Sequence, residues 1–216
     1  MITNMRLPKK QNIQETNPED PLKYHFMPFI GRFYIKRLQI ALEYLVSETK
    51  QYDKILEVGY GSGIFFPELV RHCKKLQGLE VFGLKEQNIV RKMMLKENIC
   101  VDLIQGSILD IPFPGDYFDA LICISTIEHL EPKDIDQALS EIKRVVKKDG
   151  TIIIGFPSMR KSMQLYAMMM MKTLNFDHHK SNHKLILKKI NDNMKVATMT
   201  KFFRFLPIYY IVKCIK

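Results

Sequence analysis

Three glycines at every second position, Gly59, Gly61 and Gly63, follow a short apolar run over residues 55–58 that suits a buried strand. Glycine permits a sharp turn and lets a ligand approach the backbone closely. A strand, a glycine turn and a helix N-terminus together build a nucleotide site at the carboxyl edge of a parallel sheet. The spacing G-x-G-x-G is not the dinucleotide fingerprint G-x-G-x-x-G. The stretch therefore predicts a nucleotide-type site, with an ordinary glycine turn of another α/β protein as the alternative.

A carboxylate, Glu57, stands two residues before the first of these glycines. The pattern E-x-G-x-G-x-G after a strand resembles the first motif of class I S-adenosylmethionine-dependent methyltransferases. The resemblance implies that Glu57 faces the methionine end of S-adenosylmethionine, which carries an ammonium group and a sulfonium. It also implies that the turn residues Gly59, Tyr60, Gly61 and Gly63 bind this cofactor.

A second carboxylate, Glu80, follows Glu57 by 23 residues and ends the next apolar run. An acidic residue at an offset of about 20 residues reaches a ribose diol in nucleotide-binding sheets. Val81 and Phe82 come directly after it, and the Phe82 ring is expected along the adenine. The alternative is a surface carboxylate at the end of a strand.

The stretch from Gly106 to Asp119 resembles the G-D-x-x-x-L-P-F…F-D segment of the same methyltransferases. Members of that family usually carry Asp where this chain has Ser107, to accept a hydrogen bond from the adenine amino group. The resemblance implies that Ser107 and Ile108 contact the adenine, with a weaker hydrogen bond at Ser107.

The loop after the fourth predicted strand reads Ile124-Ser125-Thr126-Ile127-Glu128-His129 and again resembles the family. In open α/β sheets the chemistry lies in such loops. Ile124 and Ser125 are expected at the cofactor and Thr126 at the substrate. His129 is either a general base, because imidazole titrates near neutral pH, or a residue that holds the loop in place.

Apolar segments alternate with amphipathic ones, which predicts an α/β fold with a Rossmann-like doubly wound sheet. The resemblance implies seven strands, mostly parallel, closed by a C-terminal antiparallel hairpin. Strands are predicted near residues 55–58 and over 76–81, 101–105, 118–124, 151–156, 196–203 and 209–215. Helices are predicted within 22–50 and over 64–70, 85–98, 134–148 and 185–193.

Composition indicates a globular chain of 216 residues with 46% apolar residues and four scattered cysteines that form no C-x-x-C pair. No apolar run reaches the ~18 residues of a membrane span and no signal peptide is recognisable, so a cytoplasmic protein is expected. Residues 1–21 are predicted to form a flexible arm. Residues 22–216 are predicted to form one methyltransferase domain with an insertion rich in Met and His at about 157–184.

The net charge of +10 lies at one end of the chain. Residues 157–216 hold 12 Lys/Arg against Asp177 and Asp192, whereas the preceding residues hold 21 of each sign. A basic end suggests an anionic substrate, a membrane surface or nucleic acid, with a solvated surface as the alternative. The uncharged segment Ser162 to Met171 is expected to be a substrate lid, a membrane-facing flap or part of the core.

Three histidines follow that segment, namely His178, His179 and His183. They are expected to bind the substrate rather than a metal, because no third convincing ligand accompanies the pair His179 and His183.

The sequence thus predicts an S-adenosylmethionine-dependent methyltransferase acting on an O, N or C atom of a lipid-like or glycolipid acceptor at an anionic membrane surface. A small-molecule methyltransferase for a quinone or metabolite is one alternative, and a binding module for S-adenosylmethionine without turnover is another. Nucleic acid is not an expected partner.

Overall fold

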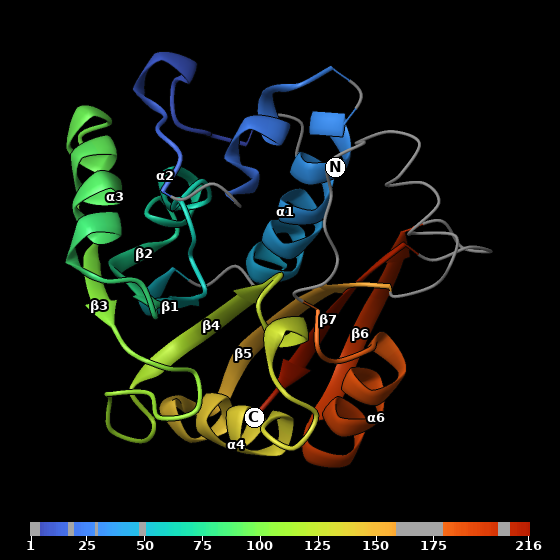
Figure 1. The fold of residues 1–216 in the computed structure, drawn as a ribbon. Coiled ribbons are helices and arrows are strands. Elements are labelled where there is room, and N and C mark those ends of the chain that lie inside the picture. The colour runs from blue at the N-terminus through green and yellow to red at the C-terminus, as the bar shows by residue number, and fades with distance from the viewer. Residues whose placement is uncertain (1–4, 17–19, 29, 48–50, 159–178, 203–207) are drawn as a thin grey trace.

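A seven-stranded sheet forms the centre of the computed structural model, which describes residues 5–16, 20–28, 30–47, 51–158, 179–202 and 208–216 (Figure 1). Its strand order is β3-β2-β1-β4-β5-β7-β6. The strands are β1 (Tyr52–Val58), β2 (Cys73–Glu80), β3 (Asp102–Gln105), β4 (Phe118–Ile124), β5 (Val146–Pro157), β6 (Lys195–Phe202) and β7 (Tyr209–Ile215).

The first five strands pair in parallel, and β7 pairs antiparallel with both β5 and β6. Parallel strands covered on both faces need apolar side chains on both sides, and the buried runs of β1 and β4 supply them. The predicted Rossmann-like sheet with a C-terminal antiparallel pair is confirmed.

Helices cover both faces of the sheet (Figure 1). On one face α1 (Ile30–Val46), α2 (Phe66–Leu69) and α3 (Leu84–Lys96) pack on one buried cluster. On the other face α4 (Ile135–Val145) and α6 (His183–Asn193) pack on a second cluster. Three 3-10 helices complete the described elements: η1 (Lys10–Asn12), η2 (Pro21–Phe26) and η3 (Ile127–His129).

The helix predicted over 134–148 is shorter than expected, and the strand after it is longer. Val146 already pairs with Phe118 in the sheet, so the helix ends at Val145. Asp149 adopts φ of 61° beside Gly150 within β5, where the sequence pattern predicts a break before the strand. The sheet pairing of Val146 therefore overrides the local helical pattern.

The N-terminal arm contacts the helical face of the domain. Glu68 Oε2 accepts a hydrogen bond from the backbone N–H of Arg6 (2.6 Å). Glu97 Oε1 accepts from the backbone of Lys9 (2.8 Å) and from the side chain of Asn12 (2.6 Å). The described part of the arm is thus bonded to the segments around α2 and α3, while flexibility over residues 1–21 stays a prediction.

Helix length and polarity also bear on membrane insertion. Among the helices of the described residues, none combines the length and the apolar character that crossing a bilayer requires.

Candidate functional site

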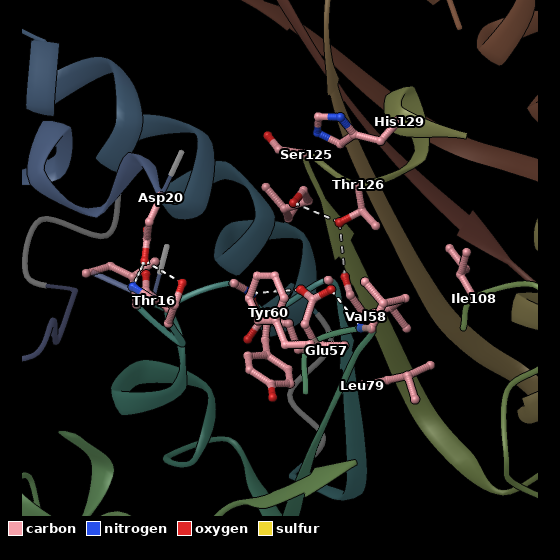
Figure 2. Close-up of a pocket in the computed structure, with 18 of the residues that line it drawn as sticks. Thr16, Asp20, Glu57, Val58, Tyr60, Leu79, Ile108, Ser125, Thr126 and His129 are labelled. Carbon is pink, nitrogen blue, oxygen red and sulfur yellow. Dashed lines mark hydrogen bonds between the residues drawn. The ribbon is translucent and has the colours of Figure 1, made fainter. Parts of the chain in front are cut away.

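The carboxyl edge of the sheet opens into a cavity of about 410 Å³, a size typical of small-ligand sites. Four strand-end loops line it, those after β1, β2, β3 and β4, together with residues from the N-terminal segments. Figure 2 shows Thr16 and Asp20 on one side of Tyr60 and Leu79 and Ile108 on the other. The cavity therefore lies where an open parallel sheet binds its ligands.

The turn after β1 has the backbone that only glycine adopts without strain. Gly59, Gly61 and Gly63 have φ of +73°, +52° and +67°. A side chain at Gly59 would also place Cβ 1.9 Å from Thr126 Oγ1, whereas one at Gly61 would meet nothing within 4 Å. Close packing on the loop after β4 thus requires glycine at 59, and the left-handed turn requires it at all three positions.

Glu80 closes the turn from the neighbouring strand. Its Oε2 accepts a hydrogen bond from the backbone N–H of Gly61 (3.1 Å), and its Oε1 accepts from the N–H of Val81 (2.9 Å). Burial raises the pKa of Glu80, and these two hydrogen bonds oppose that shift. The carboxylate is therefore fixed at the cavity wall.

Glu57 lies at the end of β1 with 5% of its surface exposed. Its Oε2 has no hydrogen-bond partner within the described part of the chain. Burial, and to a lesser extent the charge of Glu80, raises the pKa of Glu57 well above the usual range. A buried carboxyl without a partner is costly, so a cationic or hydrogen-bond-donating ligand group at this point would stabilise it.

The loop after β3 contributes Ser107 and Ile108 to the cavity. Ser107 Oγ accepts a hydrogen bond from the N–H of Leu109 (3.1 Å), so this hydroxyl holds its own turn. The hydroxyl hydrogen of Ser107 remains available as a donor. The Asp that is usual at this position in the family would act as an acceptor instead.

Arg37 of α1 is a buried cation in the cavity wall, with 8% exposure. Its Nη1 donates to Ser125 Oγ (2.7 Å), and its guanidinium lies 4.4 Å from the ring centre of Tyr34. No carboxylate of the described residues lies within ion-pair distance of it. A buried guanidinium without an ion-pair partner among the described residues suits an anionic ligand group.

Ser125, at the end of β4, is held in a left-handed conformation with φ of 57°. Its Oγ also shares a hydrogen bond with the hydroxyl of Tyr209 (2.6 Å), and its N–H donates to the carbonyl of Gly155 (2.7 Å). Such strain in a non-glycine residue is typical of functional loops. The strained backbone places the Ser125 hydroxyl between Arg37 and Tyr209.

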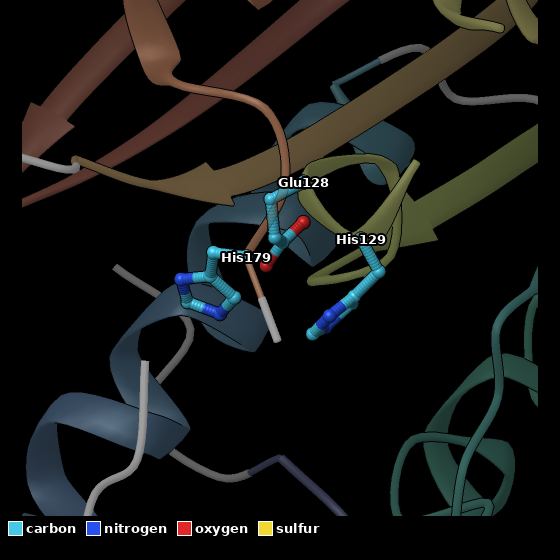
Figure 3. Close-up of side chains that lie close together, drawn as sticks. All are labelled: Glu128, His129 and His179. Atoms are coloured by element: carbon cyan, nitrogen blue, oxygen red, sulfur yellow. The ribbon is translucent and has the colours of Figure 1, made fainter. Parts of the chain in front are cut away.

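The turn at η3 carries Glu128 and His129 (Figure 3). Glu128 is 1% exposed, and burial raises its pKa to about 8. His129 is exposed and lines the cavity beside Thr126 and Leu130. His179 lies next to it, with the two ring centres 5.0 Å apart.

Most of the predicted site residues line this one cavity. The residues that do so are Glu57, Gly59, Tyr60, Gly61, Glu80, Val81, Phe82, Ser107, Ile108, Ile124, Ser125, Thr126 and His129.

The other predicted residues are placed elsewhere. Gly63 packs against Phe66 below the turn and does not line the cavity. His183 begins α6, where it is buried and stacks on Tyr210 with ring centres 5.5 Å apart. His178 and the segment from Ser162 to Met171 lie outside the described residues.

The sequence interpretation missed four cavity residues of the N-terminal segments, namely Thr16, Asp20, Arg37 and Leu38. One signal was present for Arg37. The buried face of α1 carries residues at helical spacing, namely Ile30, Tyr34, Arg37 and Ala41. Arginine is rarely buried unless it has a binding partner, so its position on this face indicates a functional role.

Comparison with known proteins gives three findings. Residues 56–154 match the family profile described as Methyltransferase domain. The chain is 28% identical over 120 residues to the Bacillus subtilis protein called uncharacterized methyltransferase YcgJ, covering 53% of this chain and 45% of the relative. It is 33% identical over 106 residues to uncharacterized methyltransferase YdaC of the same organism, covering 47% of this chain and 55% of the relative. The chain thus spans about half the length of these curated relatives.

Solved structures share the fold at low sequence identity. The N-methyltransferase NodS from Bradyrhizobium japonicum, solved in complex with S-adenosyl-l-homocysteine, superposes with a TM-score of 0.70 at 14% identity and covers 98% of this chain and 99% of its own. A SAM dependent methyltransferase from Aquifex aeolicus gives a TM-score of 0.65 at 18% identity, covering 91% of this chain and 98% of its own. At these identities the likeness concerns the fold.

Proposed function

Because residues 56–154 form a domain of the class I S-adenosylmethionine-dependent methyltransferase family, we propose that this chain transfers the methyl group of S-adenosylmethionine to an O, N or C acceptor. The observation that carries the proposal is the pair of carboxylates, Glu57 and Glu80, on either side of the glycine turn in one cavity.

The residues present fit this cofactor. The unpartnered buried oxygen of Glu57 matches an ammonium group, and the fixed carboxylate of Glu80 matches a ribose diol. The guanidinium of Arg37 matches a carboxylate, which the methionine end of the cofactor also carries.

When bound, S-adenosylmethionine supplies a methyl group on a sulfonium, which is already a strong electrophile. The chain then has to hold the acceptor in line and exclude water, and such positioning lowers a barrier by up to ~7–11 kcal/mol. Thr126, His129 and Leu130 line the part of the cavity after β4 and would contact the acceptor in this proposal. His129 serves either as a base or as a positioning residue in this proposal.

Loss of the Glu80 carboxylate tests the cofactor assignment. In Glu80→Ala we expect titration calorimetry to show S-adenosylhomocysteine binding about 1.5–3 kcal/mol weaker than in the wild type, because charged hydrogen bonds to the ribose are lost. Glu86→Ala is the matched control, since Glu86 belongs to the first turn of α3 and does not line the cavity. The proposal is contradicted if the wild-type chain binds neither S-adenosylmethionine nor its demethylated product, or if it binds NAD more tightly than either.

A lipid-like or glycolipid acceptor is the substrate class that we propose within this activity. The support is the charge distribution, because all the excess positive charge follows Pro157. Within the described residues, Lys184, Lys188 and Lys201 are exposed. Such cations favour an acceptor with an anionic head at a membrane surface, to which each adds about 1 kcal/mol.

Flotation with anionic vesicles tests the acceptor class. At low salt we expect the wild type to float with the vesicles and to be released as salt rises, because the attraction is screened. Removing the charges in Lys184→Gln/Lys188→Gln should reduce flotation. The control Lys92→Gln/Lys96→Gln removes the same charge from α3 and should float as the wild type does. A wild type that stays in the soluble fraction favours the small-molecule methyltransferase instead.

A binding module without turnover is the remaining candidate. Bound S-adenosylhomocysteine in calorimetry, together with no labelled product when cell extracts are incubated with the chain and a labelled methyl donor, would favour it.

A further inference from the structure

Two imidazoles and a buried carboxylate meet at the edge of the cavity, on segments far apart in the sequence (Figure 3). They are Glu128 and His129 of η3 and His179, which precedes α6. Each offers one ligand atom, and these atoms all lie within 4.8 Å of one another. We propose that Glu128, His129 and His179 form a binding site for a divalent transition-metal ion such as Zn²⁺.

The backbone holds the two segments together independently of these side chains. The carbonyl of Glu128 accepts hydrogen bonds from the N–H groups of Lys180 (2.9 Å) and Ser181 (3.1 Å). Ser181 Oγ donates to the carbonyl of Leu130 (2.7 Å), and Lys180 forms an ion pair with Glu131 (2.9 Å). His179 is therefore anchored beside His129 by its neighbours in the chain.

Glu128 supplies the observation that points to a ligand. Its side chain is 1% exposed, and its Oε2 has no hydrogen-bond partner among the described residues. Figure 3 shows the carboxyl group between the two imidazole rings. An unpartnered buried oxygen costs free energy, and coordination to a cation would remove that cost.

The donor set selects the class of ion. Two imidazoles and one carboxylate suit Zn²⁺ and other first-row transition ions, and they leave positions open for other ligands. Such an ion lies about 2.1 Å from each ligand atom, so the ligand atoms have to approach to roughly 3.4 Å of one another. Rotation of the two imidazole side chains supplies this movement, because His129 is exposed and His179 is half-buried.

The position of the site suggests its use. His129 lines the cavity beside Thr126 and Leu130, in the part that the proposed function gives to the acceptor. On that function, the open positions would take an acceptor oxygen and lower its pKa, which favours a hydroxyl-bearing acceptor. The ion site itself rests on the geometry alone. It differs from the expectation drawn from the sequence, which considered His179 with His183.

Cobalt titration tests the site with a readout other than activity. Tag-free protein is first stripped of metal with a chelator and is then titrated with Co²⁺, with binding followed by visible absorption. Elemental mass spectrometry of the metal content gives the number of ions bound per chain. We expect one Co²⁺ per chain with ligand-field bands that Zn²⁺ abolishes. His129→Ala and His179→Ala should each weaken binding about tenfold or more.

The matched control is His72→Ala, which removes a histidine that bonds Glu68 on the helical face and should leave cobalt binding unchanged. Circular dichroism melts show whether each variant, including Glu128→Gln, is folded. If Glu128→Gln does not fold, the two histidine variants alone test the proposal. Absence of ligand-field bands in the wild type overturns the proposal. So does cobalt binding by His129→Ala and His179→Ala with the affinity of the wild type. Calorimetry with S-adenosylhomocysteine on the same metal-free samples reports the cofactor site separately, so a failed metal site and a failed proposed function are distinguishable.

Discussion

Gly59→Ala is expected to abolish measurable cofactor binding, with a loss of at least about 100-fold in affinity. The new methyl group would lie 1.9 Å from Thr126 Oγ1, in a residue whose φ is +73°. The left-handed conformation costs a non-glycine residue about 1–2 kcal/mol, and relief of the collision must move the loop after β4 away from the cavity. Calorimetry with S-adenosylhomocysteine measures the loss, and chemical denaturation measures the accompanying decrease in the free energy of unfolding.

Gly61→Ala is the matched control for Gly59→Ala. Its φ of +52° carries the same kind of strain, but its Cβ would meet nothing within 4 Å. We expect a decrease of about 1–2 kcal/mol in the free energy of unfolding and a smaller loss of binding than in Gly59→Ala. The double variant Gly59→Ala/Thr126→Ala removes the closest colliding atom and should recover part of the affinity. Equal effects of Gly59→Ala and Gly61→Ala would show that strain alone, and not the contact with Thr126, governs this turn.

Arg37→Met is the second variant with a large expected effect. Methionine keeps much of the apolar stem but removes the guanidinium, so the carboxylate of the ligand would be buried without a partner. Truncating one member of a buried charge pair costs about 2–5 kcal/mol, which corresponds to roughly 30-fold to several thousand-fold in affinity. Calorimetry with S-adenosylhomocysteine measures this loss.

Two controls identify the cause of an effect at Arg37. Arg32→Met removes an exposed arginine of the same helix and should bind as the wild type does. The second control is 5′-methylthioadenosine, which lacks the amino-acid part of the cofactor and should lose little affinity in Arg37→Met. A similar loss for both ligands would mean that Arg37 supports the loop through Ser125 rather than binding a carboxylate.

The sequence predicted those parts of the site that depend on local patterns. The turn at Gly59 follows β1 directly and Glu80 is the last residue of β2, and parallel strands bring their carboxyl ends to one edge. Their meeting in one cavity follows from the topology. The strand positions were predicted for a similar reason, since β4 and β7 are mostly apolar over their length.

Contacts between distant segments were not readable in the same way. Arg37 donates to Ser125 across 88 residues, and the His179 ring lies beside the His129 ring although α4 and β5 separate them in the sequence. The end of α4 depends on the sheet partner of Val146, which local propensity does not contain. Tertiary pairing decides such positions, so a single sequence leaves them open.

The anchoring of the N-terminal arm has a consequence for the order of folding. Arg6, Lys9 and Asn12 bond to Glu68 and Glu97, partners that lie 62 to 91 residues further along the chain. Closing loops of that length carries an entropy cost before any contact forms, so these bonds form only after α2 and α3 are in place. The arm is thus among the last segments to dock. The part of the cavity wall that Thr16 contributes is then completed only after the arm has docked.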